Sequence, residues 1–142
     1  LPTGVKLPTR GDKVITLGSL AEQNSGLPRM PTNFKPADQA NPYADYTVQQ
    51  MYDFLSGYQL TRDPGAEFEY SNLGVGLLGH VLSRATGQSY EAMERERVWD
   101  PLGMTNTAIT FTTRTPTAHQ RCRRRWRTST QGQTTSVSYG VV

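Results

Sequence analysis

Residues 70–87 read YSNLGVGLLGHVLSRATG, and this stretch predicts the longest helix of the chain. Its apolar residues recur at intervals of three and four, which is the pattern of a helix with one buried face. These residues are Leu73, Leu77, Leu78, Val81, Leu82 and Ala85. Asn72 can cap the start of such a helix, and Gly87 can end it. We therefore expect a helix from Leu73 to about Ala85.

Three glycines lie within the same pattern, at positions 74, 76 and 79. Each costs a helix up to about 1 kcal/mol relative to alanine. A close approach of another helix is the ordinary explanation for such glycines, and we expect it here. His80 lies on the same segment, and we interpret it as a buried, hydrogen-bonded structural histidine.

Upstream, capping signals predict two further helices. Thr47 and Gln50 are spaced as a capping box, and the apolar residues that follow predict a helix over residues 48–58. Thr16 is a plausible cap for a short helix over Leu17, Leu20 and Ala21, with Gly26 as its left-handed stop. The four prolines between residues 28 and 46 predict a long loop, and residues 1–13 are expected to be loop or an extended edge.

Downstream, Ser89 can cap a helix over residues 90–98 with Tyr90, Met93 and Val98 facing inward. The sequence Asp100-Pro101-Leu102-Gly103 would then terminate it. The segments before Ile109 give little evidence of strands, so the chain is expected to be mainly helical.

The composition limits the classes of protein to which the chain can belong. A chain of 142 residues with 35% hydrophobic residues is consistent with one lean globular domain. It has no run of about 18 apolar residues that could span a membrane, and its first residues lack the pattern of a secretory signal. The sequence does not begin with Met, which suggests a processed or excised chain. The lone Cys122 excludes an internal disulfide and a zinc site of several cysteines, and we expect no metal and no cofactor.

Charge is distributed unevenly along the chain. Residues 1–100 hold nine Lys or Arg and twelve Asp or Glu, whereas residues 101–142 hold six Arg and no acid. After Ile109 aliphatic residues are scarce, so we interpret residues 110–142 as an Arg/Thr/Ser-rich low-complexity tail, in which residues 137–142 could form an edge strand. Five arginines around Trp126 leave an alternative open, a non-catalytic chain whose tail binds nucleic acid or another polyanion. Because the rest of the chain is acidic, a solvated tail is the more ordinary interpretation, and nucleic acid is not the expected partner.

Few residues form a self-sufficient chemical motif. The chain has no Gly-x-Ser-x-Gly, no His-Glu-x-x-His and no phosphate-binding loop, and no serine is followed three residues later by lysine. The tripeptide Tyr70-Ser71-Asn72 remains. A deprotonated tyrosine can act as a general base, and an asparagine amide can orient a substrate carbonyl. By itself the tripeptide is better explained by structural roles, with Asn72 as an N-cap and Tyr70 as a core aromatic.

Several motifs occur in order, and together they are more specific than any one of them. They are Ile15-Thr16-Leu17, Ser25-Gly26-Leu27-Pro28, Pro64-Gly65, Tyr70-Ser71-Asn72-Leu73-Gly74 and Asp100-Pro101-Leu102-Gly103-Met104. From about Leu1 to Ile109 the chain resembles the serine β-lactamase family of class C, with its relatives the D-alanyl-D-alanine carboxypeptidases and β-lactamase-like esterases.

The resemblance implies roles for two residues. Tyr70 matches the catalytic tyrosine that works beside the nucleophilic serine in proton transfer, and Asn72 matches the asparagine that binds the amide or carboxyl side of the substrate. Ser71 matches a variable position. The implied fold class is mainly α: residues 1–109 would be the helical subdomain of the α/β serine β-lactamase and penicillin-binding-protein fold, with the sheet subdomain largely missing.

The departures from the family pattern are as informative as the match. The family's nucleophile motif would lie upstream and its Lys-Thr-Gly-like motif downstream, and both are absent here. Glu22-Gln23-Asn24 stands where relatives often read Thr-His-Thr. We therefore expect a fragment or truncated member of these hydrolases, whose completed form would take a β-lactam, peptide or ester. Apolar faces left uncovered would favour self-association. The resemblance also suggests a periplasmic or secreted location.

Overall fold

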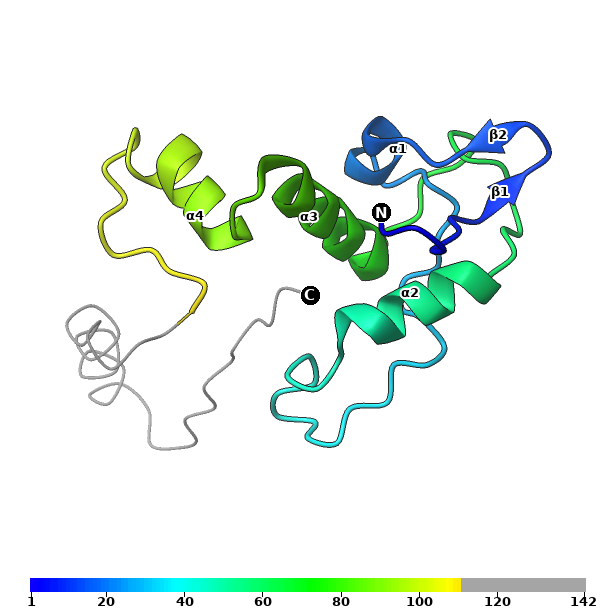
Figure 1. Cartoon of the computed structure of the whole chain (residues 1–142), viewed down its shortest axis with the longest axis horizontal. Helices are drawn as coiled ribbons and strands as arrows, with labels where there is room; N and C mark the ends of the chain where they lie inside the picture. The colour runs from blue at the N-terminus through cyan, green and yellow to red at the C-terminus, as the bar shows by residue number, and fades with distance from the viewer. Residues whose placement is uncertain (111–142) are drawn as a thin grey trace, which may run out of the picture.

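The computed structural model describes residues 1–110, which form a mostly helical chain with one small sheet. Its elements follow one another from the hairpin to the far end of α4 (Figure 1). They are β1 (Thr9–Arg10), β2 (Lys13–Val14), α1 (Leu17–Ala21), α2 (Val48–Gly57), α3 (Asn72–Thr86), α4 (Tyr90–Glu94) and a π-helical turn η1 (Arg95–Trp99). Apart from Thr110, the predicted tail, including its edge strand, lies outside the described residues.

The hairpin corrects the expectation that residues 1–13 form only loop or edge. β1 and β2 pair antiparallel, with Thr9 opposite Val14 and Arg10 opposite Lys13. Gly11 begins the two-residue connection at φ 57°, a conformation that suits a tight hairpin and that glycine adopts without strain. Both strands are only two residues long and all four residues are exposed, so no alternation of apolar and polar residues could indicate them.

The capping predictions for α1 and α2 are confirmed. In α2 the backbone N–H of Gln50 donates to the Thr47 hydroxyl at 3.2 Å, and the Thr47 N–H donates to Oε1 of Gln50 at 2.7 Å. Thr16 caps α1 in the same reciprocal manner with Ser19. The end of α1 was predicted less well. The left-handed residue that follows the helix is Gln23, at φ 59°, three positions before Gly26.

α3 begins one residue earlier than expected, and its cap is Ser71. The Ser71 hydroxyl accepts a hydrogen bond from the Gly74 N–H at 2.9 Å. The prediction that Asn72 serves as the cap is therefore wrong, because Asn72 already has helical backbone at the first position of α3. Gly87 ends the helix in the left-handed conformation, as predicted, at φ 70°.

The helix predicted over residues 90–98 is confirmed in its first turn and corrected in its second. After α4 the chain widens into η1, where the Asp100 N–H donates to the Arg95 carbonyl. A turn closed by i→i+5 bonds takes one residue more than an α-turn, so it moves the buried face one position along the chain. Trp99 is buried for this reason, whereas Val98, predicted to face inward, is exposed.

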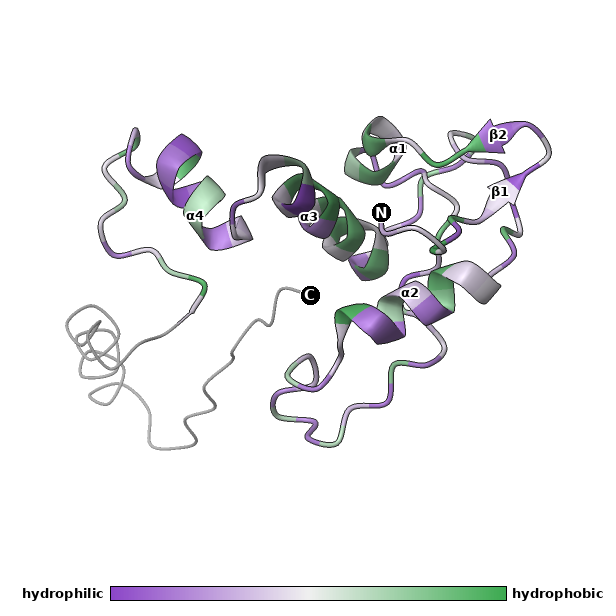
Figure 2. Ribbon diagram, in the orientation of Figure 1, coloured by the Kyte–Doolittle hydropathy of each residue, from purple (hydrophilic) through white to green (hydrophobic). Residues whose placement is uncertain are grey.

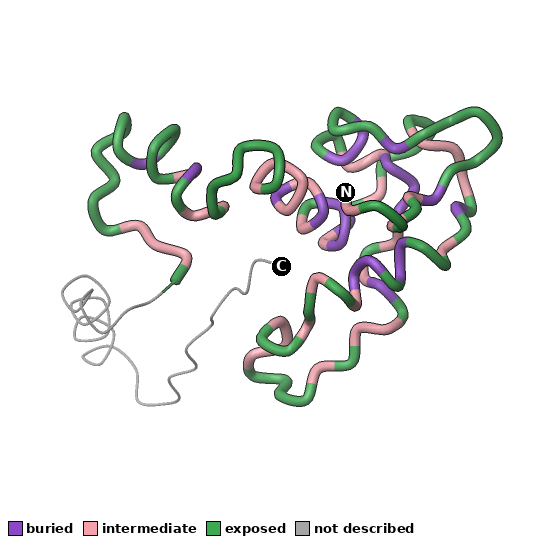
Figure 3. The backbone as a smooth tube through the Cα atoms, in the orientation of Figure 1, coloured by how far each residue is buried: buried purple, intermediate pink, exposed green. Residues whose placement is uncertain are grey.

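The core lies where α1, α2 and the first half of α3 meet. Buried residues gather there in Figure 3, while α4 is largely exposed. In Figure 2, α2 and α3 each combine hydrophobic residues, in green, with hydrophilic residues, in purple. The core residues are Ile15, Leu20, Leu27, Met51, Tyr52, Phe54, Leu55, Leu60, Leu73 and Leu77. Among the helices of residues 1–110, none is long and apolar enough to cross a membrane.

The three glycines of α3 have three different surroundings. A Cβ at position 79 would lie 3.3 Å from the ring of Tyr90 in α4, so the expected close helix approach occurs here. A Cβ at position 74 would instead press against the cap residue Ser71 at 3.3 Å. Gly76 has nothing within 4 Å of such an atom, so close packing does not explain it.

Candidate functional site

The loop that carries Tyr70 is attached to the loop that follows α1. The Glu69 N–H donates to the Gln23 carbonyl at 2.7 Å, and the Ser71 N–H donates to Oε1 of the Gln23 side chain at 2.7 Å. Directly after Ser71, the N–H groups of Asn72 and Leu73 donate to the carbonyl of Arg29 at 3.0 and 3.4 Å. Residues 69–73 are thus held at both ends, and the start of α3 has a fixed position against residues 23–29.

Ser71 sits at the centre of this attachment. Its side chain is 1% exposed; it accepts from Gly74 and donates to the Pro28 carbonyl at 2.7 Å. A buried hydroxyl with both partners in place is a structural element, because leaving any of these groups unpaired would cost free energy. The absence of a predicted chemical role for Ser71 agrees with this geometry.

Tyr70 projects away from the core. The residue is 53% exposed, which does not fit the alternative of a core aromatic. The guanidinium carbon of Arg29 lies 5.7 Å from the centroid of its ring, within the range of a cation–π contact. Tyr70 therefore presents its ring and hydroxyl at the surface on a backbone that neighbouring hydrogen bonds hold in place.

Asn72 is half-buried and faces the long loop of residues 28–46. Its Nδ2 lies 3.2 Å from the Tyr43 hydroxyl and 3.3 Å from Sδ of Met30. The amide borders a small cavity of about 30 Å³ whose walls are otherwise mainly apolar. The remaining lining residues are Pro31, Phe34, Tyr46, Met51, Leu73 and Gly76, and Tyr70 is not among them. The two predicted site residues thus lie on either side of the cap residue Ser71, and of the two only Asn72 borders this cavity.

A second polar contact crosses the core from α2 to α3. The hydroxyl of buried Tyr52 and Nε2 of His80 are 2.5 Å apart, and the two rings pack edge to face. Burial lowers the pKa of His80, and the positive charge of Arg84 lowers it further. The prediction of a hydrogen-bonded structural histidine agrees with this contact, although His80 is half-buried and not fully enclosed.

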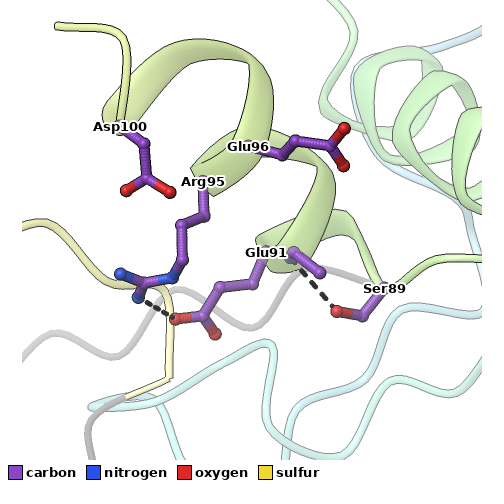
Figure 4. Close-up of a pocket in the computed structure, with 6 residues that line it drawn as sticks. Ser89, Glu91, Arg95, Glu96 and Asp100 are labelled. Atoms are coloured by element: carbon purple, nitrogen blue, oxygen red, sulfur yellow. Dashed lines mark hydrogen bonds and ion pairs between the residues drawn. The ribbon is translucent and has the colours of Figure 1, made fainter.

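A surface pocket of about 390 Å³ lies on α4 and η1, at the opposite end of α3 from Tyr70. Figure 4 shows Arg95 reaching toward Glu91, with 3.7 Å between Nη2 and Oε1. Burial acts to raise the pKa of Glu91, but hydrogen bonds from the amides of Ile109 and Thr110, together with Arg95, bring the net pKa below its ordinary value. In residues 1–110 no three His, Cys, Asp or Glu side chains gather where they could hold a metal ion.

The sequence model of the Beta-lactamase family matches residues 1–140. The chain belongs to the Beta-lactamase family. The match extends past Ile109, where the ordered motifs ended, and it confirms the resemblance to serine β-lactamases and their relatives.

Individual relatives support the same family assignment. The D-alanyl-D-alanine-carboxypeptidase/endopeptidase AmpH of Escherichia coli is 36% identical over 111 residues, covering 77% of this chain and 28% of AmpH. Protein flp of Staphylococcus aureus is 32% identical over 98 residues, covering 69% of the chain and 19% of that protein. This chain thus spans less than a third of the length of the curated relatives it matches.

Solved structures show the same partial coverage. A β-lactamase/D-alanine carboxypeptidase from Yersinia pestis, complexed with citrate, superposes with a TM-score of 0.71 at 35% identity over 80% of this chain and 32% of that one. The D-amino acid amidase of Ochrobactrum anthropi superposes with a TM-score of 0.52 at 30% identity over 69% of this chain and 28% of that one. The described residues therefore have part of the fold of a serine β-lactamase-like hydrolase.

Sequence reasoning missed several residues that shape the site. Gln23 was noted only as a departure from a family pattern, yet it holds residues 69–71 through both its carbonyl and its side chain. Its left-handed backbone was not apparent, because glutamine seldom adopts positive φ. Tyr43 and Met30 lie in the proline-rich loop, where no periodicity marks the residues that face inward. Arg29 directly follows the motif Ser25-Gly26-Leu27-Pro28 and is not part of it.

Proposed function

We propose that residues 1–109 are the helical part of a serine hydrolase that transfers or hydrolyses acyl groups, and that residues 110–142 form a separate tail. In this proposal Tyr70 acts in proton transfer beside a serine nucleophile, and Asn72 binds the substrate. The observation that carries the proposal is the exposed position of Tyr70 directly before a buried, fully bonded Ser71, in a chain 36% identical to a D-alanyl-D-alanine carboxypeptidase.

The chemistry of the two residues supports these roles. A tyrosine that exchanges a proton with a nucleophile must reach the reacting atoms, and an exposed ring on a fixed backbone meets this need. An asparagine that positions an amide must have a fixed side chain, and the contacts of Asn72 with Tyr43 and Met30 restrain it.

The nucleophile has to come from elsewhere in this proposal. None of the serines in the 142 residues is followed three positions later by lysine. Covalent acyl transfer needs a serine with an adjacent base. The proposed activity therefore belongs to a completed enzyme, with a β-lactam, a peptide or an ester as the class of substrate.

A chimera tests the proposal. Residues 1–109 would replace the matching segment of E. coli AmpH, and release of D-alanine from a peptide ending in D-alanyl-D-alanine would be measured. We expect an active chimera in which Tyr70→Phe slows release by about 10²- to 10⁴-fold, the scale of a lost general base.

Tyr58→Phe is the matched control, because Tyr58 stacks on Phe54 at the end of α2 and has no proposed role. This variant should keep the rate of the parent chimera. A folded chimera that releases no D-alanine, or one in which Tyr70→Phe and Tyr58→Phe behave alike, would contradict the proposal.

A further inference from the structure

Arg29 stands beside Tyr70, and neither the motifs nor the proposed chemistry uses it. Its backbone carbonyl accepts from Asn72 and Leu73, so the residue is fixed to the first turn of α3. Its side chain is exposed and places the guanidinium carbon 5.7 Å from the Tyr70 ring centroid. Arg29 therefore brings a positive charge to Tyr70, while its backbone is bonded to Asn72.

This charge is not neutralised by the neighbouring acid. Glu69 is the closest carboxylate along the chain to Tyr70, and it is paired with Arg62. The other ion pairs formed within residues 1–110 join Arg10 and Lys13 to Asp63, and Arg95 to Glu91. In the described part of the chain the guanidinium of Arg29 thus has no carboxylate partner.

The contact with the ring also leaves the guanidinium free to bind. A cation–π contact restricts the arginine side chain without using a hydrogen-bond donor, so the N–H groups stay available for a ligand. The guanidinium edge matches a carboxylate in a two-bond arrangement, and such charge-assisted bonds are among the strongest that an exposed side chain forms.

We infer that Arg29 binds a free carboxylate on the acyl group of the substrate, so that the site favours half-amides and half-esters of dicarboxylic acids. This inference rests on the proposed function, since it places the acyl group beside Tyr70 and Asn72. It adds a specificity residue and narrows the class of substrate to acyl groups that carry their own negative charge.

A binding experiment on the full 142-residue chain tests the inference. The probes are N-succinylglycinamide and its analogue in which a carboxamide replaces the distal carboxylate, so that the two differ in charge and hardly in shape. Backbone amide shifts in NMR titrations give both affinities. We expect the charged probe to bind about five- to tenfold more tightly at low salt and to shift the amides of residues 70–72, with a smaller preference at high salt.

Three variants locate the effect. Arg29→Gln should abolish the preference for the charged probe, and Arg29→Lys should retain part of it, because lysine keeps the charge without the planar fork. Arg84→Gln is the matched control: Arg84 is an exposed arginine near the end of α3, about 18 Å from Asn72 along the helix axis. This variant should keep the full preference.

Equal affinities for the two probes, a preference that survives Arg29→Gln, or binding of neither probe would each overturn the inference. These results are independent of the AmpH chimera, which reports on Tyr70 with an uncharged acyl group. A chimera that depends on Tyr70 while the probes show no preference would leave the proposed function standing and remove the role of Arg29. A folded but inactive chimera would instead contradict the proposed function.

Discussion

At the scale of single residues, the start of α3 shows why two adjacent capping residues are hard to tell apart. Serine and asparagine are both strong N-caps, and the prediction of Asn72 as the cap was wrong by one position. The structure assigns the cap to Ser71 because its hydroxyl can bond Gly74 and the Pro28 carbonyl together. Asn72 is thereby released to face Tyr43 and Met30, which only the three-dimensional contact with the proline-rich loop could reveal.

Replacing Ser71 should therefore cost stability, and replacing Tyr70 should not. Ser71→Ala removes a buried cap and leaves the Pro28 carbonyl without its donor, so the free energy of unfolding should fall by about 1–2 kcal/mol. Tyr70→Phe removes a hydroxyl from an exposed side chain and should change it by less than about 0.5 kcal/mol. Urea unfolding of the two variants beside the parent chain measures both. Equal losses would mean that the Tyr70 hydroxyl has a structural partner.

His80 should make the stability of the chain depend on pH. Its pKa is lowered in the folded chain, chiefly by burial and then by Arg84, so the unfolded state binds the proton more readily. The free energy of unfolding should accordingly have its full value above the ordinary histidine pKa near 6.5. It should decline as the pH falls through that pKa toward the lower pKa of the folded state. Unfolding free energies measured across this range give the slope.

His80→Gln is the matched variant, because an amide can accept the Tyr52 hydroxyl and does not titrate. The variant should lose the slope that begins as the pH falls through the ordinary histidine value near 6.5. Glu91 also has a lowered pKa. Because a carboxylate ordinarily titrates at lower pH than a histidine, the stability that Glu91 contributes is lost only at lower pH. An unchanged slope in His80→Gln would assign the dependence to another group.

At the scale of elements, helices with a repeating apolar face and a capping residue were predictable, and irregular elements were not. The cap at Thr47 and the periodicity after it placed α2 to within one residue. The hairpin and the π-turn have no such pattern, because two exposed residues show no alternation and a wider turn keeps the local preferences of an α-helix. The left-handed Gln23 likewise depends on tertiary hydrogen bonds to residues 69–71 that its own sequence does not encode.

The glycines of α3 offer a prediction about helix packing. Gly79→Ala would place a methyl group 3.3 Å from the Tyr90 ring, so α4 must shift or the contact must loosen. We expect the melting temperature to fall. Gly76→Ala meets nothing within 4 Å and should raise stability by up to about 1 kcal/mol through helix propensity. Thermal unfolding followed by circular dichroism compares the two. A gain in both variants would show that Tyr90 yields without cost.

At the scale of the whole molecule, the described residues have one core and several uncovered apolar side chains. Phe68 is 74% exposed, Leu102 69% and Val14 58%. Exposed apolar groups of this size favour association with other surfaces, and self-association of the isolated chain stays a prediction. The family could be predicted because several short motifs occur in a fixed order along the chain, and one of them, Tyr70-Ser71-Asn72, forms the start of α3. The surfaces that would cover these exposed residues could not be predicted, because no pattern within the chain indicates which partner covers them.

The isolated chain should not form an acyl-enzyme. Acylation by a β-lactam requires a reachable serine with an adjacent base. Ser71, which follows Tyr70, and Ser25 are both buried, at 1% and 2% exposure, with their hydroxyls bonded to backbone groups. The intact mass after incubation with benzylpenicillin should therefore be unchanged, while E. coli AmpH provides the family control for the assay. A stoichiometric adduct would contradict this prediction, and peptide mapping would then identify a serine activated without the neighbouring lysine.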